Sequence, residues 1–166
     1  MILWLLLFGA AVIITTCFGY WAHKFLHIGL MGVFSTSHKT HHEKLYPLND
    51  YKSDIYRSAG KDSATIFFLI ISLPLLAMPF VMMLFGILSL FSALFMTASM
   101  VFIGWVHDYT HDSFHINNHW LGRIPLFKSY YNYLERMHLI HHKDEMKNFG
   151  IITFFWDKIF GTLLQK

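Results

Sequence analysis

Cysteine is almost absent from this chain, whose only thiol is Cys17, within an apolar run. A single cysteine excludes an intrachain disulfide, and it excludes a zinc site built from several cysteines. We therefore expect Cys17 to serve only in packing.

Charged residues are scarce as well, at 14% of the chain, whereas soluble domains average about 25%. Residues 1–23 and 63–107 contain no Asp, Glu, Lys or Arg, and all 13 Lys and Arg lie in 24–61 and 123–166. This distribution excludes an ordinary soluble domain. The formal net charge of +3 would suit nucleic-acid binding, but basic residues that flank apolar runs are explained by the positive-inside rule. We expect no nucleic-acid partner.

The first apolar run, residues 2–22, is long enough to cross a bilayer, which needs about 20 residues. A secretory signal peptide is the alternative, but such a peptide begins with basic residues, and here Lys24 follows the run instead. We predict an uncleaved span with its N-terminus outside and its other end in the cytoplasm.

The second apolar run, residues 63–106, is too long for one crossing. As one helix it would extend roughly 66 Å, about twice the thickness of the hydrocarbon core. We predict a hairpin of two spans, 64–84 and 87–106, with Gly86 in the turn and with Pro74 and Pro79 kinking the first arm.

The predicted architecture is a single all-α integral membrane domain over 1–166, with about three transmembrane helices. Residues 23–62 and 107–166 would form a cytoplasmic helical cap. Every histidine and every Lys and Arg lies in these two segments, so charge and histidine placement agree on a multi-pass protein with its C-terminus in the cytoplasm.

Histidine is abundant, with 12 residues in four clusters next to the apolar runs. The clusters are His23 and His27; His38, His41 and His42; His107, His111, His115 and His119; and His138, His141 and His142. Two of them repeat the pattern H-x-x-H-H. Neutral imidazole is the commonest nitrogen ligand of transition metals, so this repetition predicts a metal centre at the membrane surface.

The spacing of the histidines places several of them on shared helix faces, because residues three and four apart are neighbours on a helix. It suggests two similar half-sites, each an H-x-x-x-H pair followed by an H-x-x-H-H triad. The first would hold His23, His27, His38, His41 and His42. The second would hold His138, His141 and His142 with members of the stripe His107, His111 and His115. We expect His119, beyond that stripe, to have a structural role.

Imidazole suits Zn, Cu, Fe and Ni alike, so the ligand type does not select the metal. A zinc protease is excluded because His42-Glu43 is not followed by a second histidine at the required spacing. A membrane metal carrier or metal-binding protein stays open as an alternative to an enzyme. Nearby carboxylates could accept the second N–H of the ligating imidazoles; the candidates are Asp108, Asp112, Glu135, Asp144 and Glu145.

These motifs together resemble the integral-membrane fatty acid hydroxylase and sterol desaturase superfamily, to which carotene hydroxylases are related. The resemblance covers about 21–163 and is carried by four segments: His23 with His27, Ser37-His38-Lys39-Thr40-His41-His42-Glu43, Tyr133-Leu134-Glu135-Arg136-Met137-His138-Leu139-Ile140-His141-His142, and Asn148-Phe149-Gly150 with Trp156-Asp157-Lys158-Ile159-Phe160-Gly161-Thr162. The chain departs from the family in having three predicted spans where four or more are usual.

The resemblance implies a centre of two Fe ions, with Zn possible in a purified form, that uses O₂ as cosubstrate to hydroxylate or desaturate a lipid. It implies ligation by His23, His27, His38, His41, His42, His138, His141 and His142. The fatty acid hydroxylase pattern would add His111 and His115, whereas the carotene hydroxylase pattern is closer to His107 with His111.

The same resemblance leaves a fatty acyl, sphingolipid, sterol or carotenoid substrate open. It also implies an external electron donor, such as cytochrome b5 or ferredoxin with its reductase.

Overall fold

The structure is a computed structural model that describes residues 1–57 and 64–166, and the side chains of these except 64–70. The described residues form helices joined by loops, with one isolated bridge and no strand. The elements are α1 (Ile2–His27), α2 (Val33–Thr40), the π-helix η1 (His41–Leu45), the 3₁₀ turn η2 (Leu48–Asp50), α3 (Ala64–Leu84), α4 (Leu90–Phe114), the 3₁₀ turn η3 (Trp120–Arg123), α5 (Pro125–Lys143) and α6 (Phe155–Ile159). The predicted all-α class is confirmed. Residues 58–62 of the predicted cap, and Ser63 at the start of the second apolar run, lie outside the described residues.

Two of these helices, α1 and α4, are long and apolar enough to cross a membrane, and the described part of α3 adds a shorter apolar helix at 71–84. Gly86 lies between α3 and α4 with φ of +70°, a conformation that glycine adopts at little cost. Helix α4 begins at Leu90, three residues after the predicted start of the third span, and continues to Phe114. This extension carries the helix toward the histidine clusters.

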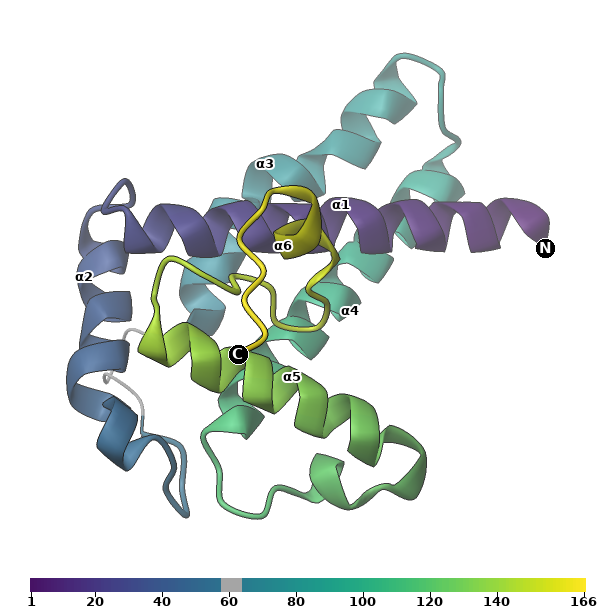
Figure 1. Cartoon of the computed structure of the whole chain (residues 1–166). Coiled ribbons are helices and arrows are strands. Elements are labelled where there is room, and N and C mark those ends of the chain that lie inside the picture. The colour runs from purple at the N-terminus through teal and green to yellow at the C-terminus, as the bar shows by residue number, and fades with distance from the viewer. Residues whose placement is uncertain (58–63) are drawn as a thin grey trace.

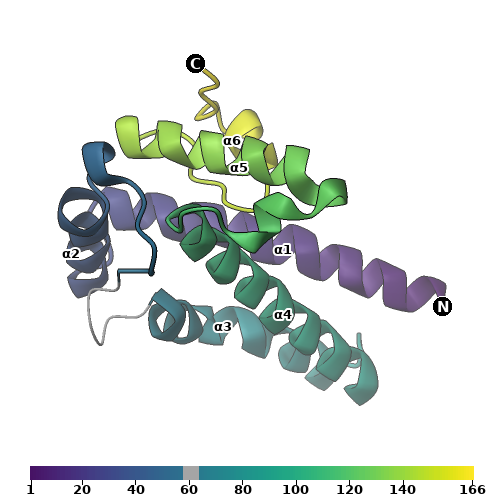
Figure 2. The same ribbon diagram turned by 90° about the horizontal axis from the view of Figure 1, so that it is seen from below.

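The apolar helices pack through small and flexible side chains. Helix α4 contacts both α1 and α3 (Figures 1 and 2), and a buried cluster joins Leu7 and Ala11 of α1 to Met96, Met100 and Ile103 of α4. Further along the same interface, α1 and α4 approach closely: a Cβ added at Gly19 would lie 3.2 Å from Nε2 of His107. Packing of this kind holds apolar helices together where lipid offers no hydrophobic drive.

The remaining elements gather around the C-terminal half of α1. In Figures 1 and 2, α2 and the C-terminal end of α5 lie at the end of α1 that follows the apolar run. Pro125 starts α5, a position where proline loses no helical hydrogen bond. A second buried cluster joins α5 to the end of α4 and the C-terminal segment, with Phe114, Met137 and Ile151 among its members.

We predict that Met100→Ala destabilises the α1–α4 interface by about 2 kcal/mol, because Met100 is 1% exposed and its truncation leaves a cavity. Phe102→Ala, two residues along the same helix, is the control, since Phe102 is 54% exposed. Thermal unfolding of the detergent-solubilised protein should show a lower midpoint for Met100→Ala alone. Equal midpoints for the two variants would contradict this interface.

Candidate metal centre

The histidines converge into two adjacent groups. The first contains His23, His27, His38, His42 and His141, and the second contains His41, His115, His138 and His142. Within each group the candidate ligand atoms all lie within 4.8 Å of one another. The two groups touch, because the rings of His42 and His142 stack at a centroid distance of 4.0 Å.

The first group is assembled from four elements. His23 and His27 lie one turn apart at the end of α1, His38 comes from α2, His42 from η1 and His141 from α5. Their Nε2 atoms face one another, with separations of 3.1 Å for His23–His38, 2.8 Å for His27–His38, 2.9 Å for His27–His141, 3.3 Å for His23–His27 and 3.2 Å for His38–His42.

The second group lies between η1, the end of α4 and α5. Nε2 of His115, the residue that caps α4, is 3.1 Å from Nε2 of His41 and 3.2 Å from Nε2 of His138. The Nε2 of His142 is buried without a hydrogen-bond partner. Four buried imidazoles therefore present nitrogen atoms to one small volume.

The two H-x-x-H-H motifs exchange their middle histidines, which corrects the half-sites predicted from spacing. His41 belongs with His138 and His142, and His141 belongs with His38 and His42. The reason is helical geometry: residues four apart differ by about 40° around the axis, whereas adjacent residues differ by about 100°. Each motif therefore contributes its outer pair to one group and its middle histidine to the other.

Only one member of the third histidine cluster belongs to either group, because the cluster is spread along α4. His115 joins the second group, and the ring of His111 flanks that group at 4.8 Å from His138 and 5.0 Å from His41. His107 lies outside both groups, against Gly19 and 3.2 Å from a carboxylate oxygen of Asp108. Eight residues of helix separate His107 from His115, which is about 12 Å of rise.

His119 lies apart from both groups, as expected. It caps η3 by accepting from the backbone N–H of Leu121, and its Nε2 is 3.4 Å from the hydroxyl of Tyr109. Its position is consistent with the structural role predicted for it. Metal ligation by the other eleven histidines stays a prediction.

Backbone carbonyls orient several of the imidazoles. Nδ1 of His23 donates to the carbonyl of Phe149 at 2.7 Å, and Nδ1 of His141 donates to that of Lys147 at 2.6 Å. In the second group, the carbonyls of Tyr51 and Tyr46 accept from His115 at 3.0 Å and from His142 at 3.1 Å. These four partners were not predictable from the sequence, because a main-chain carbonyl has no signature in residue type.

These bonds determine which ring nitrogen is free. A carbonyl only accepts, so Nδ1 carries the proton and Nε2 keeps its lone pair. His27 follows the same rule, because its Nδ1 is 3.4 Å from a carboxylate oxygen of Glu145. In the first group three lone-pair nitrogens therefore face one another, with His27 2.9 Å from His141 and 3.3 Å from His23.

Such an arrangement fits a metal cation. Facing lone pairs repel unless a positive charge lies between them. For a metal–nitrogen bond of about 2.1 Å, adjacent ligands of an octahedron are about 3.0 Å apart, close to the observed separations. Five nitrogens in the first group also exceed the four ligands of a structural zinc site.

Three of the five candidate carboxylates lie beside a histidine ring nitrogen, among them Asp108 beside Nδ1 of His107. Asp112 lies 3.2 Å from Nδ1 of His111, and Glu145 lies near both His27 and His42. Glu135 instead pairs with Lys52 at 2.7 Å, and Asp144 accepts from the backbone N–H of Met146. Four of the nine converging histidines donate their second N–H to a backbone carbonyl instead.

The environment favours neutral, metal-binding imidazoles. Burial lowers the pKa of His38, His41, His138 and His141 well below the usual histidine value, and neighbouring imidazoles lower it further. The pKa of His142 falls to about 3, again mainly through burial. A neutral ligand is the form that binds a metal ion, so these shifts keep the ligands ready at neutral pH.

The exchange of middle histidines can be tested with two double variants. We predict that His38→Ala with His141→Ala removes ligands from one group only and leaves one bound ion per chain. His138→Ala with His141→Ala changes two neighbours in one motif, yet should remove both ions. Metal analysis of the purified variants measures this. The reverse result would restore the half-sites predicted from spacing.

The lowered histidine pKa values predict acid sensitivity of the metal-free protein. Below pH about 6.5 the unfolded chain binds protons that the folded histidines refuse, so stability falls as the pH falls. For His142 alone, with a pKa of about 3, the loss at pH 5 is about 2 kcal/mol. Thermal unfolding of chelator-treated protein from pH 8 to pH 5 checks this. A midpoint that stays constant or rises on acidification would contradict it.

Comparison with known proteins agrees with these observations. A family model described as fatty acid hydroxylase matches residues 8–162, nearly the whole chain. Searches of curated proteins and of solved structures returned no match. The family match includes both groups of converging histidines and the C-terminal segment that orients them. The chain therefore belongs to the fatty acid hydroxylase family.

Proposed function

We propose that this protein is an O₂-dependent di-iron hydroxylase that inserts oxygen into a C–H bond of a lipid. The observation that carries this proposal is the convergence of nine buried or half-buried histidines into two touching groups. Membership of the fatty acid hydroxylase family supports the reaction type.

The donor set favours iron as the resident metal. Imidazole suits iron, and the number of nitrogens in the first group suits a coordination number above four. The first ion would be held by His23, His27, His38, His42 and His141, and the second by His41, His115, His138 and His142 with His111 beside them. His107 would support α4 rather than bind the metal, because it lies against Gly19.

When bound, the iron pair would supply the activation of O₂, and the chain would supply binding, orientation and exclusion of water. The histidines are well suited to that part, because seven of the nine are buried and His115, His138 and His141 are fully buried. The Nδ1 hydrogen bonds hold the rings in place.

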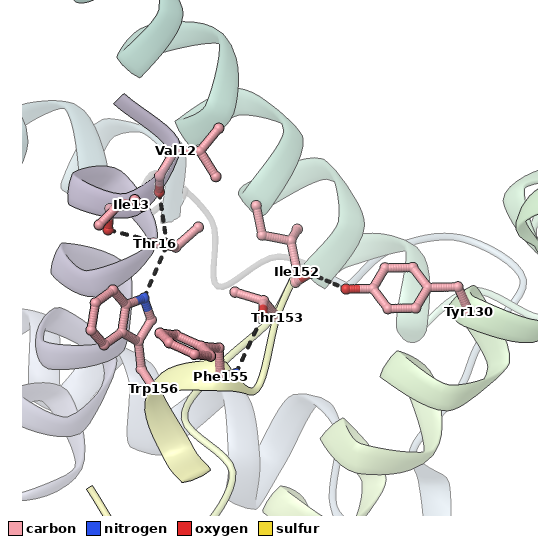
Figure 3. A pocket seen from close by; sticks show the side chains of 8 residues that line it. All are labelled: Val12, Ile13, Thr16, Tyr130, Ile152, Thr153, Phe155 and Trp156. Carbon is pink, nitrogen blue, oxygen red and sulfur yellow. Dashed lines mark hydrogen bonds between the residues drawn. The ribbon is translucent and has the colours of Figure 1, made fainter. Parts of the chain in front are cut away.

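A cavity beside α1 supports a lipid substrate. It measures about 340 Å³, and most of its lining is apolar. The lining residues are Val12, Ile13, Thr16, Tyr130, Ile152, Thr153, Phe155 and Trp156 (Figure 3). Thr16 is two helical turns before His23, so the cavity lies on the same side of α1 and about 10 Å along it. We propose that an acyl or isoprenoid chain lies there.

The membrane topology follows from the charge pattern. The candidate spans α1 and α4 carry no acidic or basic residue before Lys24 and Asp108 respectively. We propose that the N-terminus lies outside and that the histidine groups and the C-terminus lie in the cytoplasm, where Lys and Arg are enriched.

Hydroxylation also requires a partner. One oxygen atom of O₂ enters the C–H bond and the other leaves as water, which consumes two electrons and two protons. No donor domain accompanies the histidine groups in the described part of the chain. We propose that cytochrome b5 or a ferredoxin, with its reductase, delivers the electrons.

Two alternatives remain distinct. A desaturase of the same superfamily would remove two hydrogens instead of inserting oxygen. A metal carrier or metal-binding protein would use the histidines without any lipid product; the buried, carbonyl-anchored rings favour a fixed centre over a carrier, because a carrier must release its ion.

Expression in a host with a suitable reductase tests the proposal. We expect about two irons per chain and a new hydroxylated lipid, found by comparative lipid analysis. His141→Ala should abolish the product, while His119→Ala, which alters a histidine outside both groups, should retain it. A new double bond would indicate the desaturase. A folded protein without metal would contradict the proposal altogether.

A further inference from the structure

One buried carboxylate outside the histidine groups is aimed at the loop that orients them. Asp157, in α6, is 0% exposed. Its Oδ1 accepts from the backbone N–H of Phe149 at 2.7 Å and from the hydroxyl of Thr162 at 2.8 Å, and its Oδ2 accepts from the backbone N–H of Gly150 at 2.8 Å. All three contacts are donors, which suits the ionised form. Burial raises the pKa of this carboxyl and the hydrogen bonds oppose the rise.

One of these bonds belongs to the peptide group that holds His23. The carbonyl of Phe149 and the N–H of Gly150 are the two ends of a single planar peptide. The carbonyl accepts from Nδ1 of His23 at 2.7 Å, while the N–H donates to Asp157 at 2.8 Å. A continuous chain therefore runs from carboxylate to peptide to imidazole.

The neighbouring loop peptide provides an internal comparison. The carbonyl of Lys147 accepts from His141, and the N–H of Asn148 in the same peptide donates to the carbonyl of Thr162 at 3.0 Å. Both series of hydrogen bonds run from an imidazole through a peptide group, but the series from His141 ends on a neutral carbonyl. Only the chain to His23 ends on a carboxylate.

The surrounding residues leave the loop little freedom to shift. A Cβ added at Gly150 would lie 2.1 Å from the carbonyl oxygen of Thr153 and 2.8 Å from Oδ2 of Asp157. Asn148 adopts φ of +54°, and its side chain bonds to the backbone of Met137 and Leu164. The peptide is therefore held in register with both the carboxylate and the imidazole.

We propose that Asp157 is a positioning residue that strengthens metal binding by the first histidine group through the Phe149–Gly150 peptide. Carboxylates commonly act on ligating histidines by direct contact; here a peptide group lies between them. A negative charge at the N–H end polarises the peptide and makes its carbonyl a stronger acceptor. His23 thereby becomes a better donor to the ion. This inference rests on the metal centre of the proposed function.

The test is the affinity of each histidine group for Co²⁺. The ion is titrated into the metal-free protein, with the whole chain present, against a competing chelator. Asp157→Asn removes the charge and places an amide donor among three donors, so one acceptor contact is lost. We expect one of the two ions to bind about 10–100-fold more weakly, as for other changes behind metal ligands, and the other to bind as before.

The affected ion is identified by combination. Adding His115→Ala to Asp157→Asn should weaken both ions, whereas adding Asp157→Asn to the double variant His38→Ala with His141→Ala should leave the affinity for the remaining ion unchanged. Thr162→Val is the matched control: it removes a hydrogen bond from the same carboxylate but leaves both bonds to the loop, and should bind two ions with unchanged affinity.

Gly150→Ala places a Cβ against Thr153 and Asp157, which displaces the same peptide group and should weaken the same ion. Unchanged affinity in Asp157→Asn would overturn the inference, and so would an equal loss from both groups, because the carboxylate would then only support the fold. A wild-type chain that binds no metal would instead contradict the proposed function.

Discussion

The structure of the histidine centre depends on neutral, buried imidazoles whose Nε2 lone pairs lie close to one another. Five pairs of Nε2 atoms in the first group lie 2.8 to 3.3 Å apart. This separation suits ligands of one cation, and without a cation the lone pairs repel one another. Proton-bearing Nδ1 atoms on the outer side of the rings secure this orientation through the carbonyls of Phe149, Lys147, Tyr46 and Tyr51. The loops that supply those carbonyls are therefore as much part of the centre as the histidines.

Much of the fold was predictable because it depends on periodicity and hydrophobic length. The run 2–22 became the larger part of α1, and the turn at Gly86 was confirmed. The nine converging histidines were all among the eleven candidates taken from the sequence, which also included His107 and His111. Spacing alone did not give their partition, because helical geometry separates the middle histidine of each motif from the outer pair but does not say which other element supplies its partners.

The π-helix η1 illustrates the limit of such reasoning. The spacing of His38, His41 and His42 was interpreted as that of a regular helix, but after Thr40 the chain widens, with the N–H of Tyr46 donating to the carbonyl of His41 at 2.9 Å. Local widening of this kind is frequent at functional sites. It depends on tertiary contacts rather than on residue propensity, as do the hydrogen bonds from imidazole to carbonyl. The residues that orient the histidines could therefore be identified only from the structure.

The position of the histidines also explains how the elements outside the apolar helices can be attached to α1. Apolar helices in lipid associate through packing alone, and the first group draws its members from α1, α2, η1 and α5. An ion bound by all five rings would link these elements directly, so metal binding would contribute to folding as well as to chemistry. Buried neutral histidines oppose protonation, while facing lone pairs oppose the empty state. A bound cation would accept the facing lone pairs and requires the neutral form of the rings, so the centre and the fold of the cap would depend on each other.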